Sequence, residues 1–270
     1  LYPRRRHLAW LESYWKARLT RERKGIDRLS LTDTGLTLAE RVSFALRDLQ
    51  RACIDASSGD SNIITLSMLP SVASKWLAPR LEKFTSRYPD IDLRISANYT
   101  LTDFNRDDVD VVLRWGKGNY PGLRSVRFME EDIFPMCSPR LLREGAHPLR
   151  APEDLKFHTL LHDEMETDWR MWLLAAKVEG VDPDKGVGFN HSNLVIQAAI
   201  DGQGVALGRS TIAHDALARG LLVKPFDLSL PSEYAFYVVC PDITADRPKI
   251  AAFRDWVVAE AARDDLPGAG

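Results

Sequence analysis

Short apolar runs alternate with amphipathic segments from about residue 62 to residue 262. The runs are rich in β-branched residues and bounded by turn residues, which is typical of buried strands, and the segments between them have helical periodicity. Strands are expected at 63–69, 92–98, 109–115, 124–129, 133–137, 158–162, 186–190, 205–208, 221–226 and 234–240. Helices are expected at 71–87, 102–107, 169–178, 194–200 and 248–262. This alternation predicts an α/β fold in which helices cover the sheets.

Proline and glycine mark the limits of two of these helices. Pro79 lies inside the helix expected at 71–87, where it removes a hydrogen bond and clashes with the preceding turn, so the regular part is expected to begin near it. Gly202 and Gly204 resemble a dinucleotide fingerprint, which needs its glycines between a strand and the helix that follows it. Here they come after the helix, so we interpret them as its end.

The residues before the α/β pattern predict a long helix. Thr32, Asp33 and Thr34 offer N-caps to it. Its apolar residues are spaced alternately three and four apart, at Val42, Leu46, Leu49, Cys53 and Ala56. This seam suits pairing with a second helix, and packing on its own domain explains it equally well. The polar residues 57–61 then form a hinge.

Composition describes a globular protein with a charge imbalance at one end. At 270 residues and 45% hydrophobic content, the chain is long enough for two modest domains. The net charge is −2, yet Leu1 to Arg28 contains nine Lys or Arg and three acidic residues. A basic end on an acidic body suggests a segment that binds a polyanion, and a solvated tail without function explains it about as well.

Several classes of protein are excluded by what the sequence lacks. No apolar stretch approaches the ~20 residues of a membrane span, and the first residues lack the apolar core of a signal peptide, so a cytoplasmic location without membrane contact is expected. The cysteines are widely separated, which argues against a disulfide framework or a structural zinc site and favours buried free thiols. They are Cys53, Cys137 and Cys240.

Catalytic signatures are scarce. There is no GxSxG, HExxH or P-loop, and the GKG at 116–118 is interpreted as a turn. His158 and His162 could share a strand face as metal ligands, but no third ligand is evident nearby. Acidic residues gather at Asp103, Asp107, Asp108 and Asp110, where solvated charge is the simplest explanation for all but the last. Asp110 alternates with apolar residues and could face a binding site. We predict that the protein is not an enzyme and that it binds neither a metal ion nor a cofactor.

Two serines carry a possible binding mechanism. Ser71 follows one strand and opens a helix, and Ser192 with Asn193 does the same in the second half of the chain. In open α/β sheets, ligands bind beyond the carboxyl ends of the strands, where a helix start with free N–H groups receives anions. Either serine alone is explained as an N-cap. Together, one in each half of a two-lobed protein, they favour a site for a small anion.

Five segments, taken in order, resemble the LysR-type transcriptional regulators, and within them the branch of glycine-cleavage activators and β-lactamase regulators. They are RERKGIDRLSLTDTG, LPSVASKWLAPRLEKFTSRYPDIDLRI, VDVVLRWGKGNYPGL, SNLVIQAAIDGQGVALGRS and VCPDITADRPKIAAFRDWV. The likeness runs from about Leu11 to Ala262. It implies a winged helix-turn-helix, a dimerising linker helix, and an effector-binding domain built like a periplasmic binding protein.

The resemblance also divides the chain. It implies an incomplete winged helix-turn-helix at 1–32, a linker helix with its hinge at 33–61, and a two-lobed effector-binding domain at 62–270. Lobe I is expected at about 62–138 and 241–270, and lobe II at about 139–240. A small molecule is expected to bind between the lobes.

The effector contacts implied by the resemblance fall on both lobes. They are Ser71, Val72, Asp110, Arg114, His191, Ser192, Asn193 and Phe236. His191 departs from the family's usual Asp, and Phe236 stands where relatives commonly have Tyr, so an effector different from theirs is expected. We predict a small anion, a carboxylate, as the ligand.

The remaining implied partner is DNA. The wing-like residues Arg21, Arg23, Lys24 and Arg28 are the expected DNA contacts. The family's recognition helix is missing upstream of them, so phosphate contact without sequence readout is expected of this chain. The resemblance implies as partners double-stranded DNA for the intact protein, the effector, further copies in a homodimer or homotetramer, and RNA polymerase. The alternative is a solute-binding protein of the same two-lobed fold without DNA binding.

Overall fold

The structure is a computed structural model that describes residues 20–22, 29–39, 41, 42, 46, 49, 62–104, 106–144, 146–163 and 169–264. The chain divides into two compact units, Leu1–Ser61 and Asn62–Gly270. No described helix combines the length and the apolar content that a membrane crossing requires.

The first unit contains a hairpin and a helix. Strand β1 (Thr20–Glu22) pairs antiparallel with β2 (Leu29–Leu31). Residues 33–39, 41, 42, 46 and 49 are helical. Thr32 caps this helix as predicted, because its Oγ1 accepts a hydrogen bond from the backbone N–H of Gly35 at 3.1 Å.

The predicted apolar seam is described in part. Val42, Leu46 and Leu49 are exposed, with 46%, 62% and 62% of their surface accessible. Cys53, Ala56 and the hinge at 57–61 lie outside the described residues. Packing of the seam on its own domain and pairing with a second chain both stay predictions.

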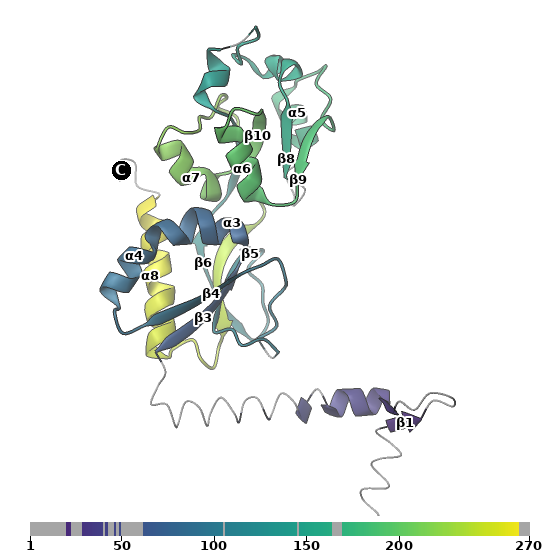
Figure 1. Cartoon of the computed structure of the whole chain (residues 1–270), viewed down its shortest axis with the longest axis vertical. Helices are drawn as coiled ribbons and strands as arrows, with labels where there is room; N and C mark the ends of the chain where they lie inside the picture. Colours follow the sequence, from purple (N-terminus) through teal and green to yellow (C-terminus); the bar gives the residue numbers. More distant parts are fainter. Residues whose placement is uncertain are drawn as a thin grey trace, which may run out of the picture. The chain divides into compact units, whose positions relative to one another are not determined.

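The second unit is built on two five-stranded sheets, one in each lobe (Figure 1). In lobe I the strand order is β4-β3-β5-β12-β6, with the bounds β3 (Ile63–Met68), β4 (Asp92–Ala97), β5 (Val111–Gly116), β6 (Leu123–Met129) and β12 (Ala235–Pro241). In lobe II it is β11-β7-β10-β8-β9, with the bounds β7 (Asp132–Met136), β8 (Leu160–Asp163), β9 (Gly186–Phe189), β10 (Val205–Arg209) and β11 (Leu230–Pro231). Each sheet has parallel and antiparallel pairs, which confirms the predicted α/β class.

The chain crosses between the lobes one strand earlier than we expected at both places. Strand β7 pairs with β10 and belongs to lobe II, whereas residues 132–136 were expected in lobe I. Strand β12 pairs with β5 and β6 and belongs to lobe I, whereas residues 235–240 were expected in lobe II. The apolar pattern shows that a strand is buried but not which sheet it joins.

The helical segment after β3 shows the effect of Pro79. It runs through α3 (Pro70–Val72), a π-turn η1 (Ala73–Leu77), a 3₁₀ turn η2 (Ala78–Arg80) and α4 (Leu81–Arg87). Pro79 has no N–H to donate, so the bonds around it change register: Ala78 donates to the carbonyl of Ala73, and Leu81 to that of Ala78. The regular helix begins at Leu81, near the proline, as predicted.

The other helices are α5 (Trp169–Ala176), α6 (Ser192–Ile200), α7 (Ser210–Ala218) and α8 (Pro248–Asp264), with short 3₁₀ turns η3 (Pro139–Leu142) and η4 (Pro152–Phe157). Figure 1 shows α8 beside α4, where the ring of Phe84 lies 5.4 Å from that of Phe253 and 5.1 Å from that of Trp256. Helix α6 ends as predicted, with Gly202 at φ +74° and Gly204 so close to the carbonyl oxygen of Thr159 that a Cβ has no room.

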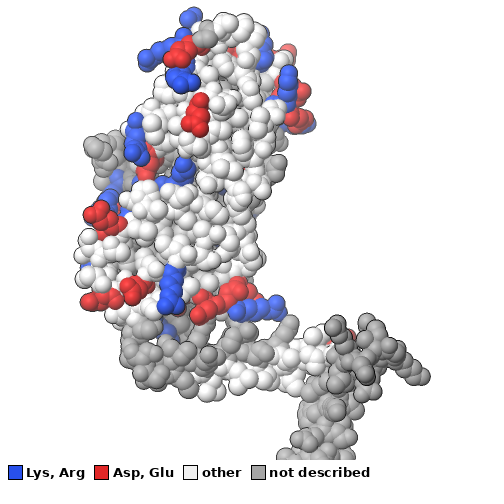
Figure 2. All heavy atoms as spheres, viewed as in Figure 1, with Lys and Arg blue, Asp and Glu red and all other residues white. Residues whose placement is uncertain are grey.

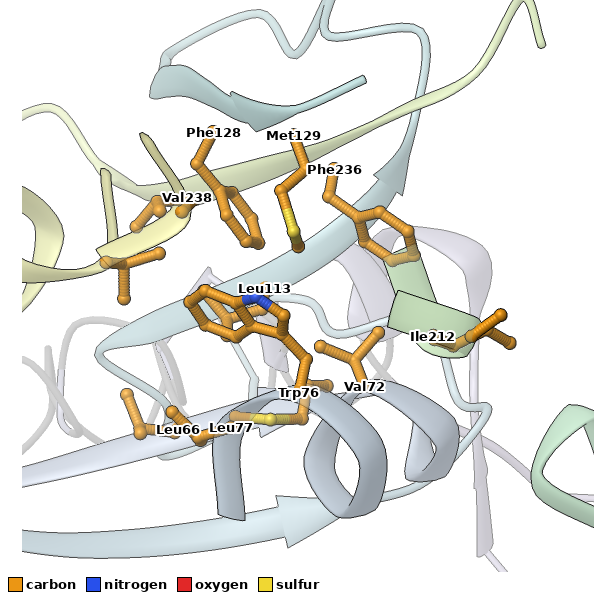
Figure 3. Packing of buried hydrophobic residues seen from close by; sticks show 14 of the residues in the cluster. Leu66, Val72, Trp76, Leu77, Leu113, Phe128, Met129, Ile212, Phe236 and Val238 are labelled. Atoms are coloured by element: carbon orange, nitrogen blue, oxygen red, sulfur yellow. The ribbon is translucent and has the colours of Figure 1, made fainter. Parts of the chain in front are cut away.

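The larger hydrophobic core runs through both lobes (Figure 3). Trp76 is its centre in lobe I, 1% exposed and 5.3 Å from Phe128 between ring centroids. The same cluster includes Ile196 of α6 and Ile212 of α7. The lobes are therefore joined by continuous apolar packing, and a smaller cluster fills the far part of lobe II.

Two expected elements are wrong. Residues 102–104, 106 and 107 form turns and bends instead of the expected helix, and Asp107 accepts a hydrogen bond from the backbone N–H of Asp103. Residues 221–226 form a single bridge between Val223 and Cys137 instead of a strand. Pro225 lacks the N–H that a longer ladder needs. The lobe II sheet uses β11 at this edge instead.

Candidate functional site

The lobes meet where strands from both sheets end. Trp115 lies near the end of β5, and Asp163 and Arg209 are the last residues of β8 and β10. Helix α3 follows β3 and contacts α6, which follows β9. Figure 1 shows α3 on the side of lobe I that faces α6 and α7. The carboxyl ends of parallel strands are where α/β proteins bind ligands, so we take this junction as the candidate site.

Ser71 and Ser192 lie on the two facing helices and are both buried, with 3% and 4% of their surface exposed. Neither is the N-cap of its helix: those positions are Leu69 and His191, and neither has a side-chain capping bond. The explanation that both serines merely cap helices is therefore wrong. Val72 is fully buried in the hydrophobic core, which gives it a packing role.

His191 and Asn193 flank Ser192 at the start of α6. The Nδ1 of His191 lies 2.7 Å from the hydroxyl of Tyr99, a residue of lobe I, and the two rings are 4.9 Å apart. The amide oxygen of Asn193 is buried and has no hydrogen-bond partner. The start of α6 thus supplies a hydrogen bond between the lobes, from His191 to Tyr99, and a buried acceptor without a partner, Oδ1 of Asn193.

Arg209 is a buried charged residue at the junction, and the sequence analysis did not select it. The residue is 3% exposed, and its Nη2 is buried without a hydrogen-bond partner. Its guanidinium carbon lies 4.3 Å from the ring centroid of Trp115, across the junction. Trp115 also stacks on Tyr234 at 4.5 Å, and its indole N–H is likewise buried without a partner. The signal for Arg209 was an arginine placed directly after the buried run 205–208.

The other buried charge is Asp163. Its Oδ2 lies 3.9 Å from Nη2 of Arg209, beyond hydrogen-bond distance. Burial, and then the negative charge of Asp163, raise the pKa of Tyr99, while the positive charge of Arg209 lowers it. Tyr99 therefore keeps its hydroxyl proton at neutral pH beside both charges.

Two of the expected contact residues lie elsewhere, and a third is part of the hydrophobic core. Neighbouring residues of a strand point to opposite faces, so Arg114 faces away from the side on which Trp115 meets Arg209. Its guanidinium stacks on Tyr120 at 4.7 Å. Asp110 precedes β5 and accepts a hydrogen bond from the backbone of Thr65 at 2.8 Å, so it joins two strands away from their carboxyl ends.

Phe236 is the third. It is 1% exposed and belongs to the hydrophobic core, with its ring 6.2 Å from that of Phe128. Figure 3 shows its side chain beside Ile212 of α7. It pairs with Trp115 in the sheet register and is an apolar neighbour of the site.

Metal and thiol chemistry find no support in the described residues. They contain no group of three His, Cys, Asp or Glu side chains that could hold a metal ion. Cys137 and Cys240 are buried free thiols, as predicted, and burial raises the pKa of Cys137 to about 12. Cys53 lies outside the described residues.

The expected DNA contacts are described only in part. Arg21 lies in β1, and residues 23–28 lie outside the described residues. The hairpin of β1 and β2 is the kind of element that a wing requires. Figure 2 shows positive and negative residues interspersed over the visible face of the described surface, without a broad patch of one sign.

Comparison with known proteins gives consistent matches. The sequence profile of the LysR substrate binding domain matches residues 57–262. The glycine cleavage system transcriptional activator of Escherichia coli (strain K12) is 47% identical over 201 residues, covering 74% of this chain and 66% of that protein. The HTH-type transcriptional activator AmpR of Providencia stuartii is 30% identical over 236 residues, covering 87% and 79%. The chain thus spans about two thirds of the length of the first relative.

Solved structures show the same architecture. The effector domain of the transcriptional regulator AmpR of Pseudomonas aeruginosa superposes with a TM-score of 0.62 at 28% identity, covering 74% of this chain and 95% of that chain. CrgA, a LysR-type transcriptional regulator from Neisseria meningitidis, gives 0.59 at 20% identity, covering 95% and 88%. The second likeness concerns the fold alone.

Proposed function

Because the chain belongs to the LysR-type transcriptional regulators, a family that binds DNA and effectors and is not enzymatic, we propose that its two lobes sense a small carboxylate at their junction. The contacts proposed are Arg209 and Trp115 together with Ser71, His191, Ser192 and Asn193. As a regulator of transcription it acts in the cytoplasm, as an oligomer held by its linker helices.

The observation that carries this proposal is the buried, incompletely bonded guanidinium of Arg209. Burying a polar group without a partner costs ~1–3 kcal/mol, and more when the group is charged. A carboxylate is the natural acceptor for such a group, since charge-assisted bonds from arginine are about twice as strong as neutral ones. The two buried serine hydroxyls and the start of α6 add donors on the facing helices.

The proposal is tested by screening small carboxylates against the full chain by thermal shift, then measuring affinity by calorimetry. Arg209→Met should abolish binding of any ligand found, and Ser71→Ala and Ser192→Ala should each weaken it roughly ten- to a hundredfold. Arg114→Met is the matched control. It removes a guanidinium from the face of the lobe I sheet opposite to Trp115, so affinity should be unchanged. Equal binding by the Arg209 and Arg114 variants would refute the assignment.

A further inference from the structure

A stack of three side chains crosses the junction. The guanidinium carbon of Arg209, in lobe II, lies 4.3 Å from the ring centroid of Trp115, in lobe I. The ring of Tyr234 stacks on Trp115 in turn, with the centroids 4.5 Å apart and the planes inclined by 24°. Ala235 pairs with Gly116 in the sheet, so Tyr234, the residue before Ala235, falls beside the end of β5 that carries Trp115. We call Arg209, Trp115 and Tyr234 the junction stack.

Tyr234 lies on a segment that connects the lobes. The chain passes from β6 to β7 through residues 130–131, and it returns from β11 to β12 through residues 232–234. The backbone N–H of Ser232 donates a hydrogen bond to the carbonyl of Glu131 at 2.9 Å, which ties the two crossovers together. The backbone N–H of Tyr234 donates to Oγ of Ser232 at 3.1 Å. The position of the Tyr234 ring is therefore tied to the geometry of both crossovers.

Ring contacts orient the indole of Trp115. Within the described part of the chain, its N–H is buried without a hydrogen-bond partner, and so is Nη2 of Arg209. A guanidinium is attracted to the face of a tryptophan ring, and stacked rings have preferred offsets. Arg209 is 3% exposed, so little water competes for its guanidinium. The directions of the two unpartnered donors therefore depend on where Tyr234 holds the indole.

We propose that Tyr234 is a positioning residue for the junction. It holds the indole of Trp115 against the guanidinium of Arg209, and it thereby links the direction of their unpartnered donors to the segment that joins the lobes. A group that binds these donors acts on the crossover through the stack, and a change in the crossover acts on the donors by the same free energy. The inference rests on the proposed function, which assigns Arg209 and Trp115 as ligand contacts.

A double-mutant cycle between Arg209 and Tyr234 tests this link without a ligand. Arg209→Met, Tyr234→Leu and the double variant of the full chain are unfolded in urea, with circular dichroism as the readout. We expect the two substitutions to be coupled by about fivefold in the unfolding equilibrium constant. The same cycle in a Trp115→Leu background should be additive within about twofold, because the stack is then interrupted. If Arg209→Met does not fold, Arg209→Lys takes its place, since it keeps the charge and removes the planar guanidinium.

A spectroscopic readout follows the indole itself. The chain is labelled with 5-fluorotryptophan, and the fluorine resonance of Trp115 is assigned by its loss in Trp115→Phe. Tyr234→Leu should shift and broaden this resonance, whereas Tyr234→Phe keeps the stacked ring and should restore the parent spectrum and the parent coupling. Phe226→Leu is the matched control: it removes a ring that stacks on Trp172, with the centroids 5.6 Å apart, and should leave the Trp115 resonance in place.

The outcomes distinguish the inference from the function on which it rests. Additive effects of the Arg209 and Tyr234 substitutions, or equal coupling with and without Trp115, overturn the positioning by Tyr234. So does a Tyr234→Phe variant that behaves like Tyr234→Leu, because the ring is then not what acts. If these effects are absent and carboxylates bind through Arg209, the proposed function stands without the inference. If the coupling is present and no carboxylate binds the parent chain, the positioning of Arg209 stands and carboxylate sensing is overturned.

Discussion

Removing Arg80 should loosen the connection between the lobes. Arg80 lies in η2 of lobe I and donates two hydrogen bonds, of 3.0 and 2.7 Å, to the carboxylate of Asp215 in α7 of lobe II. It also donates to the carbonyl of Trp76 at 2.9 Å. The side chains of Arg80 and Asp215 are 7% and 29% exposed, so this is a largely buried ion pair that joins both lobes next to their shared core.

The expected magnitude follows from the geometry. Hydrogen bonds to charged groups contribute ~1.5–3 kcal/mol each, and the partial exposure of Asp215 reduces the value of the pair. We therefore expect a coupling energy between Arg80 and Asp215 of about 2 kcal/mol. Arg80→Met should lower the free energy of unfolding by about 3 kcal/mol, because it also leaves Asp215 half-buried without its main counter-charge.

A double-mutant cycle measures this coupling. Arg80→Met, Asp215→Asn and the double variant are unfolded in urea, with tryptophan fluorescence as the readout. Arg170 and Asp184 form the control cycle: they are also joined by two short contacts, 2.9 and 2.8 Å, but their side chains are 63% and 75% exposed, so their coupling should stay below about 0.5 kcal/mol. Equal coupling in the two cycles would show that burial at the lobe junction does not strengthen the pair.

Three further predictions concern pH, assembly and DNA. Burial raises the pKa of Asp215, but hydrogen bonds from Arg80 and His214 and the charges of both outweigh it and hold the pKa below its ordinary value. The resulting stability is present above the unfolded pKa and is lost as the pH falls through the folded pKa. In acid the parent should therefore lose more unfolding free energy than Asp215→Asn, and equal acid profiles would contradict this. Leu46 is 62% exposed on the linker helix, so Leu46→Asp should convert an oligomer to monomers in light scattering at micromolar concentration. Arg41→Asp, which lies off the apolar seam, should leave the oligomer intact. A parent that is already monomeric would refute pairing through the seam. Joint alanine substitution of Arg23, Lys24 and Arg28 should weaken duplex binding in mobility shifts uniformly across sequences and flatten its salt dependence, whereas a loss confined to one sequence would show base readout.

The sequence predicts the elements of this fold better than their arrangement. Most expected strands and helices are present, because burial imposes a regular spacing of apolar residues that is visible locally. The two elements that are wrong have local causes, a polar turn closed by Asp107 and a ladder interrupted at Pro225. The assignment of β7 and β12 to their lobes depends instead on pairing between strands distant in sequence, for which a single sequence carries little signal.

The candidate site was predictable to the extent that it depends on strand ends. Ser71, Ser192 and Asn193 were selected because a polar residue that follows a strand and opens a helix has a known physical use, and their role as contacts stays a prediction. Arg114 and Asp110 were chosen because they lie on a strand expected to line the site, without knowing to which face each points. A shift of one residue reverses the face of a strand, so naming a strand correctly leaves two candidate faces.

Arg209 and Trp115 show what decides between those faces. Arg209 directly follows the buried residues of β10, whereas Trp115 follows Arg114 near the end of β5; both lie where the lobes meet. Within either lobe alone, an arginine after a strand is explained as a solvated residue, and an indole as part of a core. The contact of 4.3 Å between them is made across the lobes, where Arg209 is 3% exposed. We expect a ligand that supplies the partners missing from Arg209 Nη2 and Trp115 Nε1 to stabilise this pairing of the lobes by its own binding energy.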